Sequence, residues 1–214
     1  MRHILAVPAD GKIRIVRYTG LLLGIGTLIA TWHFISDRPL SWRPGVLVAD
    51  DPRQVDLEAA EAIALKDARL VPHAQFNAQV RVLSRERYHL GSLADIAPLD
   101  IAVGWGPMSD SAVLADLDIS QGGRFYYWHY DSEPPVPPAV IETHSANWHL
   151  VPANDRVWKT LRSLRVGSVV NLEGLLVDIE TSDQGTIKTS LRRDDTGAGA
   201  CEILYVESVS LRYR

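Results

Sequence analysis

The chain has 214 residues, of which 46% are hydrophobic and 22% charged, proportions that exclude a disordered, collagen-like or polytopic membrane protein. Its formal net charge is −4, of which residues 1–36 contribute +3 and the remainder −7. Because so acidic a body repels a phosphate backbone, we expect no nucleic-acid partner.

The first predicted element is a transmembrane helix over residues 18–36, which contain no Asp, Glu, Lys or Arg. This length approaches the roughly 20 residues that a helix needs to cross a bilayer, and a soluble buried helix of this length is a weaker alternative. Basic residues in 1–17 place that segment in the cytoplasm. A cleaved signal peptide is the main alternative, but bulky aromatics follow the apolar run where a peptidase needs small side chains. We therefore predict a single-pass inner-membrane protein whose first partner is the lipid bilayer.

Residues 37–45 hold two prolines and a glycine, so they are predicted to form an extended tether before a soluble periplasmic domain over 46–214. Residues 57–65 score as helix, yet Lys66-Asp67 favours a hairpin turn in the second half of this region. Residues 76–82 alternate between apolar and polar, which predicts a half-buried strand.

Further along, Ser109 or Asp110 is predicted to cap a short helix, and Asn154 a second one. Residues 125–130 are aromatic and predict a strand that the following prolines stop. The last fifty residues predict strands again, with a bend or bulge at Gly174. The fold class is therefore α+β: a transmembrane helix, then a β-rich domain with two or three short helices and a small OB- or SH3-like barrel near the C-terminus.

Three phrases concentrate side chains that are costly to bury unless paired: Gly104–Asp110 (GWGPMSD), His144–Leu150 (HSANWHL) and Asp195–Glu202 (DTGAGACE). With these phrases the chain resembles a set of uncharacterised bacterial membrane-anchored proteins. The resemblance implies a common anchored architecture and no particular activity. We expect the three phrases to come together in space.

His144 and His149 are five residues apart, so neither a helix nor a strand puts them on one face. A metal site would need a turn and a third ligand. The plainer interpretation is that both histidines hydrogen-bond backbone in an irregular connection. The Asp-Thr-Gly at Asp195 resembles that of aspartic proteases, but it has no second copy and is explained by a loop. No phosphate-binding glycine motif is present, and we predict no cofactor.

Cys201 is the single cysteine, which excludes an intramolecular disulfide. A free cysteine ahead of a strand is most often a small buried apolar residue. The alternative is a nucleophile with His144 or His149 as its base and Asn147 or Asp110 as the orienting group.

The sequence thus predicts a tethered binding or assembly module without catalysis, with a possible protein partner in the cell envelope. The candidate binding residues are Trp105, Met108, Asp110, His144, Asn147, His149 and Asp195. The alternative is a periplasmic hydrolase that uses Cys201 with one of the histidines, or a metal that the histidines hold.

Overall fold

The computed structural model describes residues 38–192 and 200–212. The chain divides into two compact units, Met1–Arg38 and Pro39–Arg214, and the fold below is that of the second. The predicted segments 1–17 and 18–36 lie outside the described residues. In the part of the chain that is described, no helix is long and apolar enough to cross a membrane.

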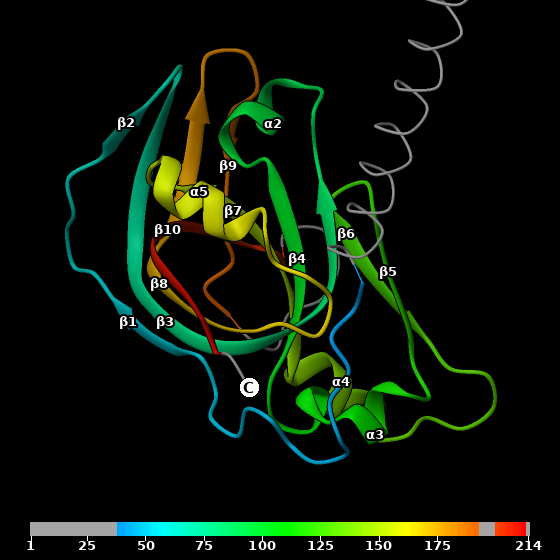
Figure 1. The fold of residues 1–214 in the computed structure, drawn as a ribbon. Coiled ribbons are helices and arrows are strands. Elements are labelled where there is room, and N and C mark those ends of the chain that lie inside the picture. The colour runs from blue at the N-terminus through cyan, green and yellow to red at the C-terminus, as the bar shows by residue number, and fades with distance from the viewer. Residues whose placement is uncertain (1–37, 193–199, 213–214) are drawn as a thin grey trace, which may run out of the picture. The chain divides into compact units, whose positions relative to one another are not determined.

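The second unit is an α+β domain rich in strands, as predicted (Figure 1). Its strands are β1 (Arg53–Asp56), β2 (Ile63–Leu65), β3 (Ala68–Arg87), β4 (Leu99–Gly104), β5 (Asp118–Gly122), β6 (Phe125–His129), β7 (Ser145–Pro152), β8 (Val169–Thr181), β9 (Gly185–Ile187) and β10 (Glu202–Arg212). Its helices are α2 (Ser92–Ile96), the 3-10 helix η1 (Gly106–Ser109), α3 (Ser111–Leu114), α4 (Pro138–Thr143) and α5 (Asp155–Leu161).

Five strands close into a barrel. β3 pairs with β4, β4 with β7, β10 with β8, and β8 with β3, all antiparallel, whereas β7 and β10 are parallel. The circuit β3-β4-β7-β10-β8 therefore returns to β3. The barrel is not confined to the C-terminal part of the chain, because its first strand begins at Ala68.

The 20-residue strand β3 is the longest element of the barrel, and both of its edges are used. β8 pairs along one edge from Ala68 to Arg81. β2, β1 and β4 follow one another along the other edge. The predicted hairpin is confirmed, since β2 and β3 are joined through Lys66, which has a φ of 52°. The helix that propensity alone favours over 57–65 does not form, because residues 63–65 pair with β3.

The barrel interior is filled by the inward-facing residues of every strand. Phe76 and Trp148 meet edge to face, with ring centroids 5.2 Å apart. Leu99, Ile101 and Leu172 are fully buried in the same cluster. Burial of each such side chain stabilises the fold by roughly 1.5–3 kcal/mol. The apolar residues of the alternation predicted over 76–82 are the residues of β3 that point into the barrel.

The two predicted helix caps are confirmed. The Asp110 side chain accepts from the backbone N–H of Ala112 at the start of α3, and that of Asn154 accepts from Val157 N–H in α5. Within α5, Val157 and Leu161 are buried against the barrel core. The helix therefore covers the barrel with its apolar stripe.

A long insertion, residues 105–144, joins β4 to β7 and carries η1, α3, the hairpin β5–β6 and α4. It has a small core of its own, in which Met108 and Ile141 contact Leu83 and Ala102 of the barrel strands. Figure 1 shows the hairpin beside the barrel and the two helices near one end of the hairpin. The insertion therefore covers part of the barrel's outer surface.

The residues predicted as a tether contact the domain from Pro39 onward. The backbone N–H of Leu40 donates to Val166 O at 2.8 Å, and Trp42 Nε1 donates to Gly167 O at 2.6 Å. Gly167 has a φ of +84°, and a Cβ there would overlap the backbone oxygen of Leu40. Pro39 rather than Val46 is thus the first residue of the compact unit.

Gly174 lies where the barrel bends, opposite a bulge between Val206 and Ser208 of β10. A Cβ on Gly174 would overlap the backbone oxygen of Tyr205, which cannot move without breaking the ladder. We expect Gly174→Ala to lower the free energy of unfolding by about 1–3 kcal/mol, measured by urea denaturation.

The matched control is Gly122→Ala in β5, where a Cβ would meet nothing within 4 Å. This change should alter the free energy of unfolding by less than about 1 kcal/mol. Equal effects of the two substitutions would contradict the close approach at Gly174.

Candidate functional site

The first two of the three phrases meet. The backbone N–H of Trp105 donates to His144 O at 3.0 Å. Gly106, with a φ of +50°, lies so close to the His144 ring that a Cβ would be 2.6 Å from its Cδ2. Of the third phrase only residues 200–202 are described, and Asp195 lies outside the described residues.

Several predicted binding residues are buried, or are hydrogen-bonded to other groups of the domain. Trp105 is buried in the barrel core, and Met108 is buried in the small core of the insertion. Asp110 accepts from the backbone N–H groups of Gly45 and Ala112, and these two bonds lower the pKa of its carboxyl group. The loop Gly104–Asp110 is therefore largely inside the protein instead of being presented to a partner.

His144 lies at the end of α4. Its Nδ1 is 3.0 Å from Val140 O and 3.0 Å from Thr143 Oγ1. These contacts match the plainer interpretation made from the sequence, in which this histidine satisfies local backbone and side-chain groups.

His149, by contrast, belongs to a polar cluster on the outer face of the barrel. Along β4 and β7 the residues alternate, so Ile101 and Trp148 point into the core while Asp100 and His149 point outward. Asp100 and His149 are direct neighbours across the two strands. The start of β10 brings Cys201 to the same face, since Ile203 is the parallel neighbour of His149.

The three side chains form a connected series. Nδ1 of His149 lies 2.9 Å from Oδ1 of Asp100. Cys201 lies close enough to the His149 ring to raise its pKa. Asp100 is fully buried, His149 is 9% exposed and Cys201 is half-buried. A nucleophile, a base and a group that orients the base therefore lie within reach of one another.

Arg124 completes the cluster from the tip of the β5–β6 hairpin. Its Nη1 donates to Asp100 Oδ1 at 2.8 Å and to Ala97 O at 2.9 Å, and its guanidinium lies 3.7 Å from the centroid of the Tyr88 ring. Arg124 has a φ of 74°, which is uncommon for a residue other than glycine. The two-residue tip, Gly123 and Arg124, thus adopts the left-handed conformation that hairpin turns require.

Asn147 connects the hairpin tip with the thiol. Its Nδ2 lies 3.7 Å from Cys201 Sγ and donates to Arg124 O at 3.1 Å, while its Oδ1 accepts from Gln121 Nε2 at 2.7 Å. Sγ itself donates to Arg124 O at 3.8 Å. The amide of Asn147 is thus fixed with an N–H directed toward the sulfur.

The electrostatics of the cluster favour a charged histidine. Burial alone lowers the pKa of His149, but its hydrogen bonds to Asp100 and Cys201 and the charges of these two groups raise that pKa to about 9. His149 is therefore an imidazolium at neutral pH.

No protein-family model, no curated protein and no solved structure matches the chain. The resemblance drawn from the three phrases therefore stays a prediction. In residues 38–192 and 200–212, no group of three or more His, Cys, Asp and Glu side chains is arranged to hold a metal ion.

The sequence singled out Cys201, His149 and Asn147 but missed Asp100 and Arg124. Asp100 is the only acidic residue in the apolar run Leu99–Val103, and a carboxylate inside a buried strand needs a partner. The sequence alone therefore contained a signal for Asp100. Nothing comparable marks Arg124, because its role depends on where the hairpin tip lies.

The raised pKa of His149 predicts a pH dependence of stability. Because the folded-state pKa of about 9 exceeds the ordinary 6.5, the stabilisation is complete below pH 6.5 and is lost as the pH rises through 9. At about 1.4 kcal/mol per pKa unit, the loss is on the order of 3 kcal/mol. Urea denaturation at a series of pH values measures it.

His149→Gln should remove this decline between pH 6.5 and 9, whereas His129→Gln, at an exposed histidine of β6, should retain it. A decline of equal size in the His149→Gln protein would show that another group is responsible.

Proposed function

We propose that the protein is a thiol-dependent acyl hydrolase, anchored in the inner membrane with its catalytic domain in the periplasm. The observation that supports it is the series Asp100–His149–Cys201, in which a histidine lies between a buried carboxylate and a half-buried thiol. The sequence treated this as the alternative, and the two histidines as equal candidates for the base. The geometry favours His149.

The roles follow from the contacts. The Cys201 thiolate attacks the carbonyl carbon of an ester, the bond to the alcohol breaks, and the His149 imidazolium gives its proton to the leaving oxygen. Water then attacks the thioester while His149 takes its proton, which releases the acid and restores the thiolate and the imidazolium. Asp100 positions the ring through Nδ1. Asn147 Nδ2 supplies an N–H beside Sγ for the negative charge that develops on the carbonyl oxygen.

We also infer that the barrel is of the OB type. The strand order β3-β4-β7-β10-β8, the parallel pair β7–β10 and the helix α5 between β7 and β8 support this. OB barrels bind ligands on the face of their second and third strands, which correspond here to β4 and β7. Asp100 and His149 lie on that face, although this comparison is one of fold alone.

A non-catalytic binding module is the second candidate, and one observation favours it. Asp100 is shared between His149 and Arg124, whose guanidinium also covers Tyr88. The same contacts therefore fasten the hairpin to the barrel. In this case the thiol has no chemical role, and a protein partner in the cell envelope binds elsewhere on the domain.

Hydrolysis of p-nitrophenyl acetate by the full-length protein in neutral detergent separates the two candidates. We expect a burst of nitrophenol with an acetyl group found on Cys201, and a loss on the order of 10³-fold or more in Cys201→Ser. His149→Gln should lose about as much, while Asp100→Asn keeps part of the activity. Because Cys201 is the only cysteine, labelling by iodoacetamide reports on this thiol alone.

His129→Gln is the matched control and should leave the rate unchanged. If the His144→Gln protein lost activity and the His149→Gln protein kept it, the assignment of His149 as the base would be contradicted. Absence of turnover, together with slow iodoacetamide labelling of the native protein, would favour the binding module.

The anchor has its own test. Because basic residues precede 18–36, a reporter fused after Arg214 should be active only if it functions in the periplasm. The full-length protein should stay in the membrane fraction after an alkaline wash. Activity of a cytoplasm-only reporter would contradict this topology, and a product shortened by about 30 residues would indicate a cleaved signal peptide.

A further inference from the structure

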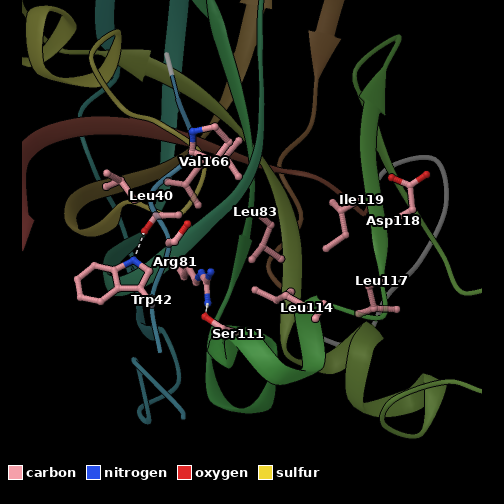
Figure 2. Close-up of a pocket in the computed structure, with 15 residues that line it drawn as sticks. Leu40, Trp42, Arg81, Leu83, Ser111, Leu114, Leu117, Asp118, Ile119 and Val166 are labelled. Carbon is pink, nitrogen blue, oxygen red and sulfur yellow. Dashed lines mark hydrogen bonds between the residues drawn. The ribbon is translucent and has the colours of Figure 1, made fainter. Parts of the chain in front are cut away.

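A pocket of about 470 Å³ opens on the domain where three parts of the chain meet (Figure 2). One wall is the segment Pro39–Trp42, another is the part of β3 from Arg81 to Leu83, and the third is α3 with the start of β5. Its volume lies within the range of small-molecule sites. None of the residues of the Cys201 cluster lines it.

Arg81 is the unusual residue of this pocket, because its guanidinium is buried without a direct ion-pair partner among the described residues. The residue is 8% exposed. Its Nη1 donates to two neutral acceptors, Ser109 O at 2.9 Å and Ser111 Oγ at 2.8 Å. Within residues 38–192 and 200–212, its Nε has no hydrogen-bond partner. Among the residues that the structure describes, no carboxylate lies within ion-pair distance of it.

Such an arrangement costs free energy. A buried guanidinium needs a counter-charge and filled hydrogen bonds to offset the loss of water. Burial lowers the pKa of Arg81, and Asp110, the nearest compensating charge, already accepts from two backbone N–H groups. An anion in the pocket would supply a counter-charge beside the guanidinium.

Apolar side chains form one part of the remaining lining, which also contains the polar Ser41 and Ser111. Leu83, Leu114, Leu117 and Ile119 form one continuous side, and Leu40 and Val166 lie opposite in Figure 2. Asp118 is the acidic residue of the lining, and Figure 2 shows it across the pocket from Arg81. The pocket therefore has a cationic end and a hydrocarbon side.

We propose that this pocket binds an anionic amphiphile, a carboxylate or phosphate head on an alkyl chain, with the head at Arg81 and Ser111 and the chain along Leu83, Leu114 and Ile119. The hydroxyl of Ser111 accepts from Arg81, so its own proton is available to the same anion. The lining begins at Pro39, three residues after the predicted membrane helix 18–36, and a membrane is where such amphiphiles are abundant.

Native mass spectrometry of the full-length protein released from a neutral detergent tests the proposal. The probes are dodecanoate, dodecyl phosphate, the neutral dodecyl maltoside, and inorganic phosphate. We expect one equivalent of dodecanoate or dodecyl phosphate to be retained, and neither the neutral amphiphile nor inorganic phosphate. Which of the two anionic probes binds more tightly identifies the head group.

Two variants distinguish the contribution of the ligand's anionic head group from that of its alkyl chain. Arg81→Met should weaken binding of the anionic amphiphile at least about tenfold, while Arg69→Met, at an exposed arginine of the same strand paired with Glu180, should leave it unchanged. Ala115→Phe narrows the pocket at an exposed lining residue without touching Arg81, and it should reduce binding even if Arg81→Met fails to fold.

Equal retention of dodecyl maltoside, or binding that survives Arg81→Met with the fold intact, would overturn the role of the guanidinium. Retention of inorganic phosphate as strong as that of dodecyl phosphate would overturn the role of the alkyl chain. Failure of both anionic probes to bind would overturn the proposal as a whole, while leaving the thiol chemistry at Cys201 untouched.

Discussion

The antiparallel pairing of β3 with β8 is the constraint on which the rest of the domain depends. It joins residues near 68–81 with residues near 169–181 and so turns a sheet into a closed barrel. Closure forces a sharp bend, which Gly174 permits because its missing side chain lets β10 approach. In the same circuit β4 pairs with β7 and β7 with β10, so side chains from three distant parts of the chain share the outer face of the barrel.

That outer face concentrates unlike charges around a single carboxylate. Asp100 lies between an imidazolium and a guanidinium, and it reaches both with the same oxygen. One negative charge cannot fully compensate two cations, so a further negative charge is favoured nearby. Cys201 and the buried Glu202 follow one another at the start of β10, beside this cluster. A hairpin tip held in the left-handed conformation keeps the guanidinium in place, which is the kind of local strain found at functional sites.

Local features of this fold could be predicted from the sequence, and long-range ones could not. The turn at Lys66-Asp67, the alternation over 76–82 and the caps at Asp110 and Asn154 depend on residues within a few positions of each other. Closure of the barrel depends on strand register over a hundred residues, which no local pattern encodes. Two short helices, α2 and α4, were not anticipated, because tertiary contacts rather than propensity stabilise helices of this length. The partner of His149 was missed for the same reason, since Asp100 becomes its neighbour only through the pairing of β4 with β7.

The docking of Leu40 and Trp42 has a mechanical consequence. Two hydrogen bonds, from Leu40 N–H to Val166 O and from Trp42 Nε1 to Gly167 O, join the first residues of the domain to the loop that leads into β8. A pull on the chain ahead of Pro39 would therefore load this loop before it reached β1. Tension would then reach β8, which pairs with β3 from Ala68 to Arg81. A force applied at the N-terminal side of the barrel would thus act on the β3–β8 ladder, which is the longest in the domain.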